Sequence, residues 1–133
     1  MTRRPNDFLQ DRVVLTEDHV QVTADTTVRL FKARRKFVVE QVRYINPTGL
    51  AVDAANYFDV LIQNGAVVMA EWSTETTVGE GAFVADTYVD LTLSTVAGAL
   101  VLDADDVLSL VLDETGTATL PAGRVQIEGR YIS

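Results

Sequence analysis

The chain has 133 residues, of which 47% are hydrophobic and 23% are charged, and it contains no cysteine. This length and composition fit one globular domain with its own core, and they argue against disorder. The lack of thiols excludes disulfides, a cysteine nucleophile and a cysteine-ligated zinc site.

The formal net charge of −8 is unevenly distributed along the chain. Residues 1–43 carry nine basic and six acidic side chains, a net charge of +3, whereas residues 44–133 carry two basic and thirteen acidic ones, a net charge of −11. An acidic body repels nucleic acid. No apolar run reaches the roughly 18 residues of a membrane span, and the N-terminus lacks the apolar region of a signal peptide. We therefore expect a soluble protein that binds neither nucleic acid nor membranes.

The first fifteen residues lack the periodicity of the remaining chain. Two interpretations stay open: an arm that becomes ordered on a partner, or a frayed terminus with one edge strand. We predict an N-terminal arm or edge strand over residues 1–15 and a single β-sandwich domain over residues 16–133. Within the arm, the candidate partner-binding residues are Arg3, Arg4, Phe8 and Leu9.

Alternation of apolar and polar residues predicts the next three strands near residues 18–23, 26–32 and 36–45. The single histidine, His19, lies beside two carboxylates near the start of the first of these strands. Zinc sites need three or four ligands, and no serine in a nucleophile-elbow sequence accompanies this histidine. We expect His19 to be a solvated turn residue.

The densest basic run of the chain joins the second and third of these strands. It predicts a hairpin tip, and its candidate partner-binding residues are Lys32, Arg34, Arg35 and Lys36. Such a tip is either solvated or meets an acidic protein surface. The flanking Phe31 and Phe37 would suit stacking on single-stranded nucleic acid, but the acidic remainder of the chain opposes that role.

Turn residues separate the central strands. Asn46-Pro47-Thr48-Gly49 interrupts the pattern, and the long connection from Pro47 to Asn56 suits a crossing between two sheets. Strands are predicted near 56–63 and 66–73, joined by Asn64-Gly65 as a two-residue type I′ turn. Trp72 shares its parity with apolar neighbours, so we expect it in or near the core.

The last strands are predicted near residues 83–93, 107–113 and 124–132. The acidic run Asp103-Ala104-Asp105-Asp106 precedes the second of them. In an EF-hand loop starting at Asp103, Val107 and Leu108 would stand where an oxygen ligand and a glycine are required. We expect a plain acidic turn there; a looser surface calcium site is the alternative.

Eight strands, frequent turns and no sustained helical period predict an all-β fold, an antiparallel β-sandwich of jelly-roll type. The chain has no nucleophile elbow, no glycine-rich phosphate loop and no set of metal ligands. We therefore expect no catalytic, cofactor-binding or metal-binding residues, no small-molecule substrate and no enzymatic activity.

Five segments carry a family resemblance: Val28–Phe31, Phe37–Pro47, Ala85–Leu91, Asp105–Val111 and Leu120–Tyr131. Together they resemble small auxiliary head proteins of tailed bacteriophages. The resemblance implies a capsid decoration (cement) protein, which is made in the host cytoplasm and resides on the outer capsid surface of the virion. It further implies binding to the major capsid protein as a homotrimer that stabilises contacts between capsomers.

A second function class stays open from the sequence. A tail-fibre or receptor-binding β-sandwich would recognise a host surface glycan by stacking aromatic side chains on sugar rings. Tyr57 and Tyr88 take the polar parity of their strands and are the candidates for such contacts, with Trp72 as a third.

Overall fold

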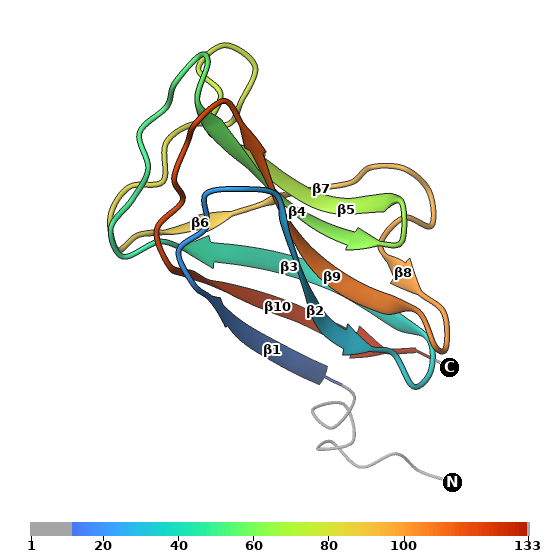
Figure 1. Ribbon diagram of the computed structural model, residues 1–133. Helices are drawn as coiled ribbons and strands as arrows, with labels where there is room; N and C mark the ends of the chain where they lie inside the picture. Colours follow the sequence, from blue (N-terminus) through green and yellow to red (C-terminus); the bar gives the residue numbers. More distant parts are fainter. Residues whose placement is uncertain (1–11, 133) are drawn as a thin grey trace, which may run out of the picture.

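The computed structural model describes residues 12–132, and in this range it contains ten β-strands and no helix (Figure 1). The strands are β1 (Arg12–His19), β2 (Thr26–Lys32), β3 (Phe37–Ile45), β4 (Tyr57–Asn64), β5 (Val67–Ser73), β6 (Tyr88–Asp90), β7 (Thr92–Leu93), β8 (Val101–Leu102), β9 (Val107–Thr115) and β10 (Gly123–Tyr131).

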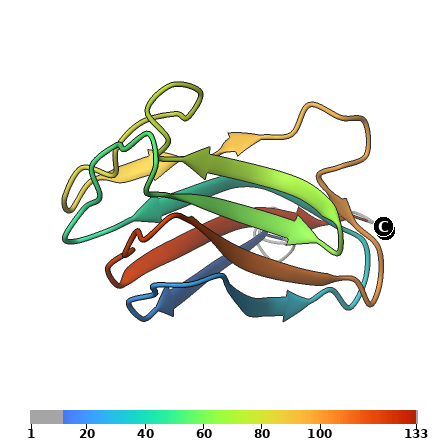
Figure 2. The same ribbon diagram turned by 45° about the horizontal axis from the view of Figure 1, so that its top comes forward.

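The strands form two antiparallel five-stranded sheets, which lie as two layers in Figures 1 and 2. The first, called here the β1 sheet, has the order β1-β10-β3-β6, and β8 also pairs with β3. The second, the β2 sheet, has the order β2-β9-β4-β5-β7. The predicted all-β antiparallel sandwich is confirmed.

The strand order is that of a jelly roll. Four antiparallel pairs are nested within one another along the chain: β1 with β10, β2 with β9, β3 with β6, and β4 with β5. This nesting arises when one long hairpin is rolled so that its successive pairs alternate between two sheets. The predicted crossing between sheets after Pro47 follows from it, because β3 and β4 belong to different sheets.

Two predicted strands differ from the observed ones. The strand expected near 18–23 is β1, which lies earlier in the chain and pairs with β10 over its whole length. Arg12–Leu15, included in the predicted arm, therefore belong to an edge strand. Arg3, Arg4, Phe8 and Leu9 lie outside the described residues.

The strand expected over 83–93 is divided between the two sheets. β6 pairs with β3, whereas β7 pairs with β5, and Leu91 between them is buried and donates its N–H to the Val42 carbonyl at 2.9 Å. The chain therefore passes from one layer to the other at Leu91. Alternation alone cannot detect this change, because the inward parity of Val89, Leu91 and Leu93 continues across it.

The turn between β4 and β5 lies one residue later than expected. Asn64 pairs with Val67, so the two turn residues are Gly65 and Ala66. Of these two, only Gly65 has a positive φ, 57°. A glycine with positive φ at the first central position is typical of a type II′ turn, not the predicted type I′.

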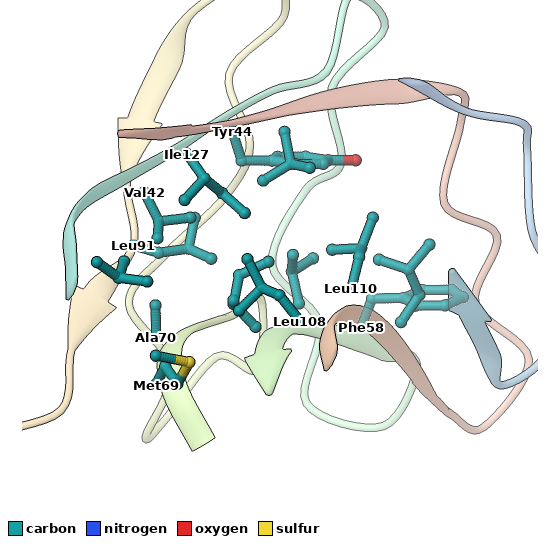
Figure 3. Close-up of a cluster of buried hydrophobic side chains, with 14 of the residues drawn as sticks. Val42, Tyr44, Phe58, Met69, Ala70, Leu91, Leu108, Leu110 and Ile127 are labelled. Carbon is teal, nitrogen blue, oxygen red and sulfur yellow. The ribbon is translucent and has the colours of Figure 1, made fainter. Parts of the chain in front are cut away.

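The core fills the space between the two sheets (Figure 3). Val42, Tyr44 and Ile127 enter it from the β1 sheet, while Phe58 and Leu110 enter it from the β2 sheet. The alternation predicted for β4 and β9 is confirmed, since the inward residues of both strands are fully buried. They are Phe58, Val60, Ile62, Leu108, Leu110 and Leu112.

Candidate functional site

The predicted basic cluster lies at the turn between β2 and β3, at one end of the sandwich. We call Lys32, Arg34, Arg35 and Lys36 the basic tip. Ala33 in its centre is fully buried, its N–H donates to the Asp106 carbonyl at 2.8 Å, and its own carbonyl accepts from the Asp105 N–H at 2.7 Å. The basic tip is thus fastened to the turn between β8 and β9.

The two lysines of the basic tip face the carboxylates of that turn. Lys32 lies 3.9 Å from Asp105, and Lys36 lies 3.9 Å from Asp103. All four side chains are exposed, so these pairs are weak and a stronger partner can replace them. The two lysines therefore pair with carboxylates of their own chain and are not simply solvated.

The two arginines lie over one aromatic ring. The guanidinium carbons of Arg34 and Arg35 are 4.9 and 4.6 Å from the ring centroid of Tyr131. Cation–π contact of this kind limits the freedom of a guanidinium without neutralising its charge. Tyr131 in turn packs edge-on against Phe37 at 5.2 Å, and this connects the arginines to the core.

The two phenylalanines that flank the basic tip do not form an open stacking platform for nucleic acid bases. Phe37 is fully buried, and Phe31 is half-buried and packs edge-on against it at 5.2 Å. The basic side chains of the tip are the ones that the sequence predicted. Phe31 and Phe37, however, pack against each other and toward the core.

A second candidate surface is an open groove of about 350 Å³ on the outer face of β4 and β5. We call it the acidic groove. Its apolar lining includes Tyr57, Leu61 and Val68. Its acidic lining residues are Asp59, Glu71, Glu75 and Glu80, and no lysine or arginine occurs between residues 44 and 123.

Several carboxylates beside the groove have structural partners. The Glu75 carboxylate accepts the N–H groups of Thr77 and Val78 at 2.9 and 2.6 Å, which lowers its pKa. Glu80 accepts the N–H of Ser73. These side chains hold the loop after β5 in place.

Carboxylates are crowded near the end of β9. Asp59 lies directly opposite Asp113 in the β4–β9 register, and Asp25 lies beside them with one oxygen accepting the Glu114 N–H at 2.8 Å. Partial burial and the neighbouring Asp25 and Asp59 raise the pKa of Asp113. Local sequence carries no signal for this contact, because the three residues come from distant segments.

The three aromatic candidates for glycan stacking do not form one platform. Tyr57 lies on the outer face of the β2 sheet, whereas Tyr88 lies on the outer face of the β1 sheet. Trp72 is half-buried as expected: its Nε1 donates to the Gly81 carbonyl at 2.9 Å and its ring stacks on Phe83. A flat sugar-binding surface would need them side by side.

The expectation for His19 was wrong. His19 is only 6% exposed, because it is the last residue of β1 on the inward parity and lies opposite Gly123, which leaves room for its ring. Its Nδ1 lies 2.7 Å from the Val20 carbonyl, and its Nε2 lies 2.6 Å from the Tyr44 hydroxyl. Burial lowers the pKa of His19 and raises that of Tyr44 to about 12.

Within residues 12–132, no three histidine or acidic side chains are grouped so as to hold a metal ion. No helix in the same range is long and apolar enough to cross a membrane. Asp106 accepts the Asp103 N–H at 2.9 Å and an Asn64 amide hydrogen at 3.0 Å, as expected for an acidic turn.

No protein-family model and no curated protein matches the chain.

Proposed function

We propose that the protein is a structural virion protein that binds the outer surface of a bacteriophage capsid. In this role it is a decoration (cement) protein whose partner is the major capsid protein, and it stabilises contacts between capsomers. The resemblance of residues 27–131 to auxiliary head proteins motivates the proposal. The same resemblance implies a homotrimer.

The observation that carries the proposal is the fixed basic tip at one end of the sandwich. Arg34 and Arg35 already lie over Tyr131, so less side-chain freedom is lost when they bind a carboxylate. Arginine also offers two parallel N–H donors to one carboxylate. An acidic protein surface is the partner that this arrangement fits best.

Lys32 and Lys36 add to the same surface. Their present partners, Asp105 and Asp103, are at 3.9 Å and exposed, so the exchange for a partner carboxylate has a small cost. A single tip gives modest affinity. Many copies on one particle, or several tips in one oligomer, strengthen attachment through effective concentration.

The test is binding to purified capsids that lack this protein. We expect Arg34→Ala with Arg35→Ala to weaken co-sedimentation with capsids at least tenfold, because each charged hydrogen bond lost contributes about 1.5–3 kcal/mol. A matched control is Arg43→Ala with Arg130→Ala, which removes two arginines from the outer face of the β1 sheet. This control should bind like the wild type.

Deleting residues 1–11 tests the arm separately, since β1 begins at Arg12 and stays intact. If the arm lies on the capsid, this deletion also weakens binding while thermal unfolding is unchanged. Full binding by the tip variant would contradict the proposed surface, and no binding by the wild-type protein would contradict the proposed function.

A further inference from the structure

The longest free sheet edge among the described residues is that of β1. Its eight residues pair with β10 in an uninterrupted register, from Arg12 opposite Arg130 to His19 opposite Gly123. Within residues 12–132 no strand pairs with its other side, so β1 is an edge of the β1 sheet (Figure 1). An uncovered edge presents backbone N–H and C=O groups that can pair with another strand.

The other edges have features that oppose pairing. β2, the edge of the β2 sheet on the same side, is interrupted by a β-bulge between Arg29 and Phe31. β6, β7 and β8 have only three, two and two residues. By contrast, β1 has no bulge, proline, glycine or lysine, and its outward Val14 is 52% exposed.

The outer face of β1 carries charged side chains near both of its ends. Arg12 stands directly opposite Arg130, and like charges in this position repel. Arg12 also lies 3.7 Å from Glu128, with both side chains exposed. At the other end of the strand, Asp18 bonds to Arg124 at 2.6 Å. Arg12 and Asp18 share the outward parity of β1, six positions apart.

We propose that β1 pairs in antiparallel fashion with β1 of a second copy of this chain, with Leu15 opposite Leu15 on the two-fold axis. In this register Arg12 of one copy faces Asp18 of the other, twice per dimer. Each Arg12 then has Arg130 on one side and an acidic partner on the other. Registers centred on Val14 or Thr16 do not bring these two charges together. The β1 sheets of both copies become one continuous sheet.

This association goes beyond the proposed function and differs from the homotrimer that the resemblance implies. A two-fold axis through β1 closes after two copies, because the same surface is used by both partners. The mass of the free protein therefore separates the two assemblies without any capsid being present.

The first measurement is the mass of the full chain by light scattering and sedimentation equilibrium over a range of concentrations. We expect a concentration-dependent rise to twice the 14.6 kDa of one chain. A monomer mass up to about millimolar concentration, or a mass of three copies, would overturn the proposal.

A charge exchange tests the register. Arg12→Asp alone and Asp18→Arg alone should each raise the dimer dissociation constant about tenfold, because both intersubunit contacts become repulsive. Mixing the two variants should restore the wild-type constant, since an aspartate of one variant then faces an arginine of the other in both intersubunit contacts. A mixture no tighter than its components would overturn the pairing.

Two controls keep this test interpretable. Arg43→Asp mixed with Asp90→Arg exchanges a pair at the opposite edge of the same sheet and should leave the dimer unchanged. If Asp18→Arg fails to fold beside Arg124, combining it with Arg124→Asp keeps the local ion pair in reversed polarity. Capsid binding by Arg12→Asp then shows whether the proposed function holds when the dimer is lost.

Discussion

At the scale of residues, a buried polar network determines the tautomer and the protonation state of His19 in the folded protein. The Val20 carbonyl can only accept, so Nδ1 carries the proton and Nε2 accepts from the Tyr44 hydroxyl. The Tyr44 oxygen in turn accepts from the Asn46 amide at 3.1 Å, and that amide also donates to the Pro121 carbonyl at 2.7 Å. Every partner is satisfied only while the imidazole is neutral.

This network makes stability depend on pH. Burial places the pKa of His19 in the folded protein below its ordinary value of 6.5, so below about pH 6.5 the unfolded chain binds a proton that the folded one resists. The contribution of His19 to stability is therefore complete above that pH and is lost as the pH falls, by at most about 1.4 kcal/mol per pH unit.

Chemical unfolding between pH 7.5 and 5 measures this loss, with His19→Gln as the control that removes the titrating group. The variant should be less stable at pH 7.5 but should show a smaller change with pH. Asp18 does not confuse the comparison, because its hydrogen bond with Arg124 lowers its pKa from the ordinary value of 3.8, well outside this range. An equal pH dependence in both proteins would contradict the assigned role of His19.

At the scale of elements, the sequence is sufficient to locate most strands but not the points where a strand bulges or changes sheet. β4 and β9 were predictable because each buries one face and alternates without interruption. Alternation fails where a bulge or a change of sheet occurs. In β5, Ile62 opposes Ala70 while the next residue, Gln63, opposes Val68, so Met69 is an extra residue and both Met69 and Ala70 point inward. Only the neighbouring strand reveals such an insertion.

Glycine at the start of β10 has a packing role that local sequence does not reveal. A Cβ on Gly123 would lie 2.4 Å from the Tyr44 hydroxyl oxygen and 2.9 Å from His19 Nε2. Gly123→Ala should therefore lower the free energy of unfolding by about 1–3 kcal/mol, the usual cost of overpacking. Gly65→Asn is a suitable control, since this turn position is open and asparagine tolerates positive φ. Equal unfolding midpoints for the two variants would contradict the close packing of Gly123.

At the scale of the whole molecule, one region of the surface carries acidic side chains without any lysine or arginine from the same stretch of chain. The acidic groove and the loops around it draw on residues 44–123, which contain no basic side chain. The charge asymmetry was visible in the sequence. The arrangement of these charges in space could not be read from the sequence. Lys32 and Lys36 pair with the turn between β8 and β9, and these contacts join residues about seventy positions apart.

The jelly-roll fold explains which of the predicted site residues lie together and which do not. The residues of the basic tip lie together because β2 and β3 are consecutive, so local sequence was sufficient. The aromatic candidates are separated because β4 and β6 belong to different sheets, and only the nesting of strand pairs decides that. Arg3, Arg4, Phe8 and Leu9 stay predictions, since they lie outside the described residues.

The central claim is that this sandwich attaches to the outside of a capsid through its basic tip. Cryo-electron microscopy of capsids with and without the added protein tests it most directly. We predict additional density of sandwich shape on the outer surface, with the turn between β2 and β3 against an acidic region of the capsid protein. Particles without added density, or density in which that turn points into solvent, would contradict it.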